Sequence, residues 1–242
     1  MTSETLTARA PRALAASMAA LFGITGNAAS AATAFQDPAS ASWGGWNRGD
    51  AGTVFQAWSM IEDEDGTAPF VFDDTPDAGS FGPSGGTNRL EEVTGGAFVT
   101  GGGLGGNVYS FSVATDWEMD IAGFGPTGLP ARVAVQTNTV GIELDYASMR
   151  LNGVAPDSIT TLFTGSAGGA FGGTVAETLF LWTLPEGQEN YEFTFNAAGS
   201  SMSLDEISVD VAPVPLPAPV ALLGSALAGL FGLTRRRGSV TA

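Results

Sequence analysis

"TLFLWTLPEGQENYEFTF", residues 178–195, contains two short stretches that fit β-strands and none that fits a helix. Residues 178–184 are almost continuously apolar, which is typical of a buried central strand. Tyr191, Phe193 and Phe195 fall at every second position, so that on a strand the three rings share one face. Pro185 and Gly187 between the two stretches favour a turn. This segment therefore predicts a β fold with an aromatic core.

The same pattern recurs through residues 33–211. Short alternating stretches occur at 108–113, 133–135, 140–146 and 203–211, and turns rich in Gly, Asn, Asp and Pro separate them. The stretch at 140–146, for example, should place Ile142, Leu144 and Tyr146 on one face of a strand. No segment keeps a helical period over three turns, and there is no fixed-length repeat of the kind a β-helix needs. We predict one all-β domain at residues 33–212, an antiparallel β-sandwich or jelly roll.

Composition limits the possible partners and chemistry. The chain has 242 residues and a net charge of −16, and the predicted domain holds every acidic residue except Glu4. An acidic surface of this kind repels phosphates, so we expect no nucleic-acid partner. The sequence has no histidine and no cysteine, which excludes a Ser-His-Asp triad, thiol catalysis and zinc–thiolate sites. We expect no enzyme activity, no catalytic residue and no organic cofactor.

Residues 1–32 have the pattern of a secretory signal peptide. Arg9 and Arg12 give a positive beginning, residues 13–24 form an uncharged apolar run, and small residues follow it. Ala29 and Ala31 fit the A-x-A cleavage rule, with cleavage expected after Ala31 and with Ala32 as the nearest alternative. This predicts an N-terminal signal helix that is removed by signal peptidase during export.

The other end carries a second apolar run. A helix over residues 218–234 would be about 25 Å long, slightly shorter than a ~30 Å hydrocarbon core, so length alone leaves a buried helix possible. The flanks favour a transmembrane helix, because prolines precede the run and Arg235, Arg236 and Arg237 follow it. The arginines should stay in the cytoplasm, which places the acidic domain on the opposite side of the inner membrane.

The residues before this helix, Val214, Pro215, Leu216, Pro217 and Ala218, complete a known pattern. The order of this motif, an apolar helix and an arginine cluster resembles the VPLPA-CTERM variant of the PEP-CTERM sorting signals. The resemblance covers about residues 212–238. It implies a Gram-negative bacterium that makes extracellular polysaccharide, cleavage near the motif by an exosortase, and transfer to the cell surface or extracellular matrix. It implies nothing about the activity of the β domain.

The densest acidic run suggests a metal site. Residues 62–65 read Glu-Asp-Glu-Asp, and three more aspartates follow within twelve residues. Calcium binds carboxylate and carbonyl oxygens on flexible loops, so the candidate ligands are Asp63, Asp65, Asp73, Asp74 and Asp77. The spacing does not fit an EF-hand. The alternative is a solvated acidic loop, which a run of like charges favours.

Two further groups of residues could contact glycans. Asp116, Glu118 and Asp120 alternate along one stretch, so on a strand their carboxylates share a face. This face could bind a cation or a sugar, but the solvent side of an edge strand fits it better. Trp43 and Trp46, together with Trp58, could stack on sugar rings if exposed, whereas large aromatics more often anchor a core.

These observations leave three classes for the domain. The first is a structural matrix or biofilm component associated with extracellular polysaccharide, which needs only export, charge and stability. The second is a carbohydrate-binding jelly-roll module, stabilised by calcium. The third is a glycan-active hydrolase with a close pair of carboxylates, for which the sequence assigns no pair.

Overall fold

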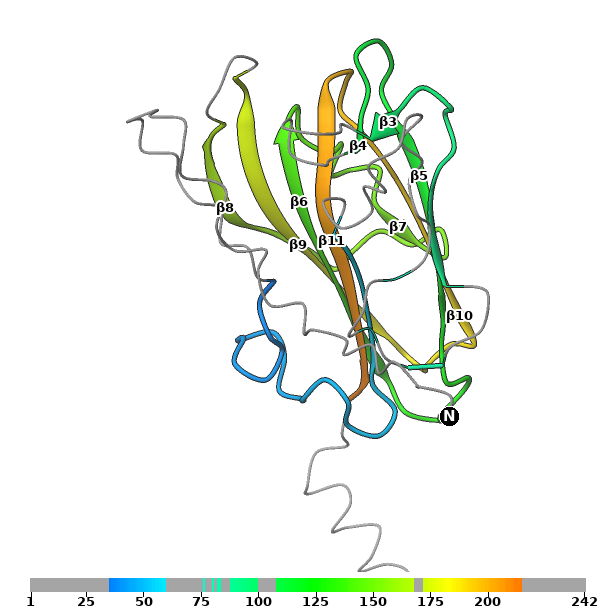
Figure 1. The fold of residues 1–242 in the computed structure, drawn as a ribbon. Helices are drawn as coiled ribbons and strands as arrows, with labels where there is room; N and C mark the ends of the chain where they lie inside the picture. Colours follow the sequence, from blue (N-terminus) through cyan, green and yellow to red (C-terminus); the bar gives the residue numbers. More distant parts are fainter. Residues whose placement is uncertain are drawn as a thin grey trace, which may run out of the picture.

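The computed structural model describes residues 35–59, 76, 80, 82–83, 88–99, 108–167 and 172–214 (Figure 1). Three groups of predicted residues lie outside them: the signal peptide with Ala29 and Ala31, the five calcium candidates, and the sorting segment after Val214. Within the described part of the chain, there is no helix long and apolar enough to cross a membrane.

The strands form two antiparallel sheets. The 7-stranded sheet has the order β3-β4-β11-β6-β9-β8, with β1 beside β11, and the 4-stranded sheet has the order β2-β5-β10-β7. The bounds are β1 Val54–Ser59, β2 Arg89–Glu92, β3 Phe98–Val99, β4 Val108–Tyr109, β5 Asp116–Ala122, β6 Ala131–Gly141, β7 Arg150–Leu151, β8 Ser158–Ser166, β9 Thr174–Leu184, β10 Asn190–Asn196 and β11 Met202–Pro213. The two sheets pack against each other, which confirms the predicted all-β sandwich architecture.

The core lies between the sheets and is largely aromatic. The two stretches of residues 178–195 enter different sheets, because β9 belongs to the large sheet and β10 to the small one. The rings of Trp182 on β9 and Phe193 on β10 meet edge to face, with centroids 5.9 Å apart. Phe195 stacks on Trp117 of β5 at 6.0 Å. Alternation along each strand thus places the large apolar side chains in the space between the sheets.

The predicted strand at residues 140–146 is wrong over most of its length. β6 ends at Gly141, where φ is +94°, and the chain then leaves the sheet. Leu144 is buried and bridges Ala197, but the side chain of Ile142 is exposed. An alternating pattern is local, whereas the end of this strand depends on a left-handed glycine packed against the backbone of Ser201.

A second apolar cluster lies on the outer face of the large sheet. Residues 35–52 cover this face, and Trp43 packs there against Ala134 of β6 and Leu179 of β9. The covering segment and the end of β11 lie at the same end of the sandwich (Figure 1). Val214 N–H donates to the Pro130 carbonyl at 2.7 Å, so the backbone is held up to the first residue of the predicted sorting motif.

Candidate functional site

The five tryptophans do not form an exposed sugar-stacking surface. Trp58 is fully buried in the core, where Trp117 and Trp182 are also buried. Trp43 is buried on the outer face of the large sheet, and half-buried Trp46 packs edge to face against it with centroids 5.5 Å apart. The large aromatic side chains therefore anchor the fold, which agrees with the interpretation of the tryptophans as core anchors and not as sugar-stacking residues.

The alternating carboxylates of Asp116, Glu118 and Asp120 share a face, as predicted, but their strand is not an edge. β5 lies between β2 and β10, so the edge-strand interpretation is wrong. The neighbouring strand β2 supplies a cation to this face. Arg89 Nε donates to Asp120 Oδ2 at 2.9 Å, and its Nη1 donates to Glu91 Oε2 at 2.8 Å. This face is a solvated surface on which charges of opposite sign are paired.

The described residues contain no group of three carboxylates positioned to hold a metal ion. On the outer face of the large sheet, Asn138 Nδ2 donates to Asp205 Oδ2 at 3.0 Å. Asp205 lies at a register shift between Leu204 and Glu206, and burial raises its pKa. The carboxylate thus has an amide partner in a partly desolvated position, while Asn138 Oδ1 is buried without a hydrogen-bond partner.

The most buried ion pair among the described residues joins Arg48 and Asp210. Arg48 Nε donates to Asp210 Oδ1 at 2.8 Å and its Nη2 to Oδ2 at 2.7 Å, and the carboxylate is fully buried. The guanidinium lies over the Phe55 ring, 3.7 Å from the ring centroid. Burial raises the pKa of Asp210, and the hydrogen bonds from Arg48 oppose that rise. Residues 48–50 form a turn, and no local pattern indicates that Arg48 pairs with a residue 162 positions away.

A hydrogen-bond network holds the same segment on the sheet. Gln136 Oε1 accepts from the Gln36 N–H at 2.8 Å, and Gln136 Nε2 donates to the Gln36 carbonyl at 3.1 Å. Gln36 Oε1 in turn accepts from Trp43 Nε1 at 3.0 Å, and Arg132 Nη1 donates to the Trp43 carbonyl at 2.7 Å. These contacts fix Gln36 and Trp43 to β6, whereas the indole N–H of Trp46 is buried without a hydrogen-bond partner. The hydrogen bonds indicate a structural role for residues 35–52.

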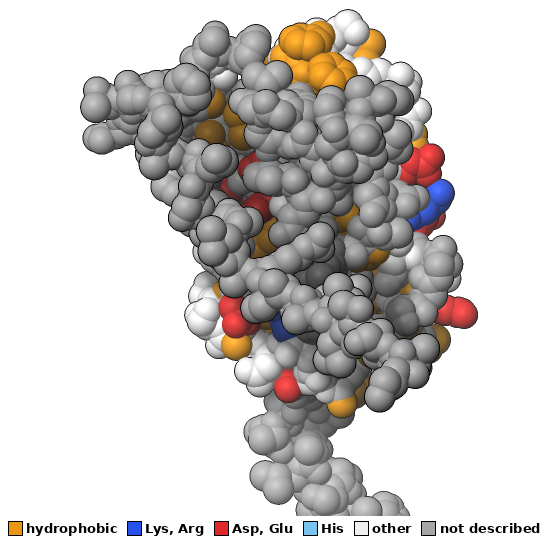
Figure 2. All heavy atoms as spheres, in the orientation of Figure 1, with side chains coloured by type: hydrophobic (Ala, Val, Ile, Leu, Met, Phe, Trp, Pro, Cys, Tyr) orange, Lys and Arg blue, Asp and Glu red, His pale blue; other side chains and the backbone are white. Residues whose placement is uncertain are grey.

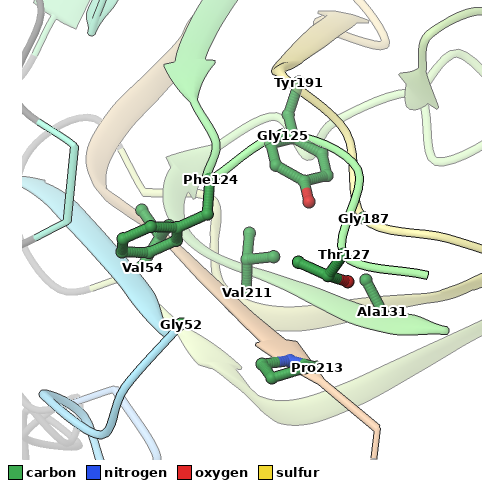
Figure 3. Close-up of a pocket in the computed structure, with 10 residues that line it drawn as sticks. All are labelled: Gly52, Val54, Phe124, Gly125, Thr127, Ala131, Gly187, Tyr191, Val211 and Pro213. Carbon is green, nitrogen blue, oxygen red and sulfur yellow. The ribbon is translucent and has the colours of Figure 1, made fainter. Parts of the chain in front are cut away.

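A hollow opens at the end of the sandwich where β11 ends. It is lined by ten residues from β1, β6, β10, β11 and the loops beside them, and the Tyr191 ring is directed into it (Figure 3). Its volume is about 10 Å³, which is room for about one water molecule. The Gln188 N–H donates to the Tyr191 hydroxyl at 3.1 Å. The hollow is too small to bind a sugar ring.

An aromatic cluster at the opposite end is exposed. Phe98 on β3 lies beside Tyr109 on β4, and Phe111 packs against both, with centroids 5.5 Å from Phe98 and 4.7 Å from Tyr109. Phe98 is 42% and Phe111 62% exposed. Hydrophobic side chains are visible at this end of the molecule in Figure 2. The stretch at 108–113 indicated Tyr109 and Phe111, but Phe98 joins them only through the pairing of β3 with β4.

Comparison with known proteins gives no relative from which a site could be transferred. No protein-family model matches the chain, and no curated protein matches it. The exposed aromatic cluster is thus the feature of the described residues that best fits a ligand surface, and the other groups hold the fold together.

Proposed function

We propose that this chain is an exported β-sandwich protein that an exosortase cleaves and that is displayed on the cell surface or in the extracellular matrix. The observation that carries the proposal is the tail, in which Val214, Pro215, Leu216, Pro217 and Ala218 precede an apolar run and three arginines. On the surface the protein acts as a structural, polysaccharide-associated component. A soluble, self-repelling acidic exterior suits that setting.

The positions of the described strands are compatible with this fate. Every strand of the described residues lies between Val54 and Pro213, and the residues described before β1 are 35–53. Cleavage after Ala31 and near Ala218 would therefore remove none of these strands. The signal peptidase and the exosortase can therefore remove the two predicted signals while the core stays intact.

We also infer a jelly-roll topology. In a jelly roll, a long hairpin folds over so that strands pair in nested order across two sheets. Here β4 pairs with β11, β5 with β10 and β6 with β9. The first and third of these pairs lie in the large sheet and the second in the small sheet. β8 departs from the pattern, because it pairs with β9 instead of extending the small sheet beside β7.

The sorting proposal is tested by deleting Arg235, Arg236 and Arg237. We expect the unprocessed chain to accumulate, because the positive charge that retains the helix in the membrane is lost. The readouts are the mature mass and the cellular fraction in which the protein is found. The matched control replaces all three arginines by lysine, which keeps the charge and should keep processing. Unchanged mass and location in the deletion would refute the proposal.

Carbohydrate binding is a second candidate, and the cluster of exposed Phe98 and Phe111 with half-buried Tyr109 favours it. Aromatic faces bind the apolar faces of sugars, and the rings of Phe98 and Phe111 are adjacent and accessible. A glycan array probed with and without calcium tests it, with Phe111→Ala as the variant. Binding that survives this change would exclude the aromatic cluster as the site. No feature of the described residues favours the hydrolase.

A further inference from the structure

β8 is a long, exposed and uncharged edge of the large sheet. It runs from Ser158 to Ser166 and, among the described strands, pairs with β9 alone. Residues 158–161 are all exposed, and Ile159 is 43% exposed. No residue of the strand carries a charge or is a proline. An edge with these properties presents backbone N–H and C=O groups to a second strand.

Among the described residues, the other edges have a short length, charges or a covering contact, and β8 has none of these three. β2 has four residues, three of them charged, and its Arg89 is held in ion pairs. β7 and β3 have two residues each. β1 has a further contact beyond β11, since the Ala57 N–H donates to Ser80 Oγ at 3.1 Å. Short length, charge and covering contacts are the usual means of preventing edge-to-edge pairing.

We propose that β8 is a self-association edge, at which a second copy of this chain pairs antiparallel through its own β8. Two identical edges related by a two-fold axis form a self-complementary contact. The cross-strand neighbours would be serine, threonine and isoleucine, and threonine pairs of this kind stabilise antiparallel ladders.

Charge favours a second copy at this edge over other positions on the surface. Two chains that each carry −16 repel each other, and β8 is a long strand on which no carboxylate would face its copy. The first half of β8 is the better segment for pairing with a second copy. Ser158–Thr161 lie opposite uncharged residues of β9, whereas Phe163 lies opposite Glu177.

The bulge at Leu162 sets the strength of the contact. The register of β8 on β9 shifts between Thr161 and Phe163, which interrupts a regular ladder. A contact of four to nine residues is small compared with a stable dimer interface, so the association is weak and grows with local concentration. Crowding on a cell surface would supply that concentration.

The first test is sedimentation of the full chain over a concentration series, at low salt and at high salt. We expect a monomer–dimer equilibrium that strengthens with salt, because salt screens the repulsion between acidic bodies. Thr160→Glu should weaken it about tenfold or more, since it adds a carboxylate to each of the two paired edges. Ser112→Glu adds the same charge beside the exposed aromatic cluster and should leave it unchanged.

Cysteine scanning gives a second measurement that does not require a disruptive variant. The chain has no cysteine, so single substitutions across residues 158–166 introduce the one thiol present. Antiparallel pairing predicts that oxidation cross-links copies at one or two positions near the axis, and that Ser112→Cys does not cross-link.

Three outcomes would overturn the proposal. The first is a chain that stays monomeric at all concentrations. The second is dissociation by Ser112→Glu instead of Thr160→Glu, which would place the contact at the aromatic cluster. The third is cross-linking that is equal at all positions, which would indicate random collisions. Failure of sorting in the arginine deletion leaves this result unaffected, so the two proposals are tested separately.

Discussion

At the residue scale, the pair Arg48–Asp210 has the largest expected effect on stability. The Asp210 side chain is fully buried and the Arg48 side chain is 21% exposed, so both groups have lost most of their hydration. A bidentate contact offsets that loss only while both partners are present. Removing one partner leaves a charge in a site from which water is excluded.

We predict that Arg48→Met lowers the free energy of unfolding by about 3–5 kcal/mol at neutral pH, because Asp210 then remains buried without its partner. Urea denaturation measures the change. Arg48→Met combined with Asp210→Leu should recover most of the loss, because the second change removes the unpaired carboxylate. Arg89→Met, which breaks only solvated ion pairs, serves as the control and should have little effect. Equal stability of the single and double variants would contradict the prediction.

Asp205 gives a prediction about pH. Burial raises its pKa in the folded chain above the value in the unfolded chain, so the folded state binds the proton more tightly. The stabilisation from this proton is complete below the unfolded pKa and is lost as pH rises through the folded pKa. Asp205→Asn keeps an oxygen for Asn138 but does not titrate. We expect the stability of the variant relative to the parent to increase from about pH 3 to about pH 8. A difference that does not change with pH would refute this.

At the element scale, the ends of strands depend on single backbone positions. β6 pairs with both β9 and β11 along its whole length and then ends at Gly141. This glycine has a φ of +94°, and a Cβ there would collide with the Ser201 carbonyl. Both the conformation and the close contact require glycine.

We predict that Gly141→Ala lowers the free energy of unfolding by more than about 1 kcal/mol, since it adds a steric clash to an unfavourable φ. Gly45→Ala is a matched control, because Gly45 has a φ of +111° and no atom within 4 Å of the added Cβ. The control should lose less stability. Thermal denaturation of the two variants checks this, and an equal loss would mean that the contact with Ser201 has no cost.

At the scale of the whole molecule, excess negative charge opposes folding. The segment between residues 33 and 212 contains almost all of the 25 acidic residues. Its only cationic residues are Arg48, Arg89, Arg132 and Arg150. Repulsion among these carboxylates is greater in the compact state than in the expanded one. Salt reduces it, because the screening length falls to about 8 Å at 0.15 M.

We predict that raising sodium chloride from about 0.01 M to about 0.5 M increases Tm by about 2–4 °C, which corresponds to about 1 kcal/mol for a domain of this size. Calcium chloride at the same ionic strength is the comparison. A further increase with calcium would support a site formed by the candidates Asp63, Asp65, Asp73, Asp74 and Asp77. A Tm that falls with sodium chloride would contradict the role given to repulsion.

The sequence by itself determined the class of fold and the faces of the main strands. Alternation at Tyr191, Phe193 and Phe195, and at Ile207, Val209 and Val211, predicted buried faces that the structure has. These features follow from the period of two along a strand, which is a local property. The sorting prediction is also local, because it depends on the order of a motif, an apolar run and a charge cluster.

Only the tertiary structure decided which strands are neighbours and which surfaces are exposed. It placed residues 178–184 and 191–195 in opposite sheets, joined Arg48 to Asp210, and gave β8 a single partner, β9, among the described strands. It also showed that Asp116, Glu118 and Asp120 lie on an inner strand. Each of these results depends on contacts between residues far apart in the chain, and a local pattern fixes the two faces of a strand but not the strand that lies beside it.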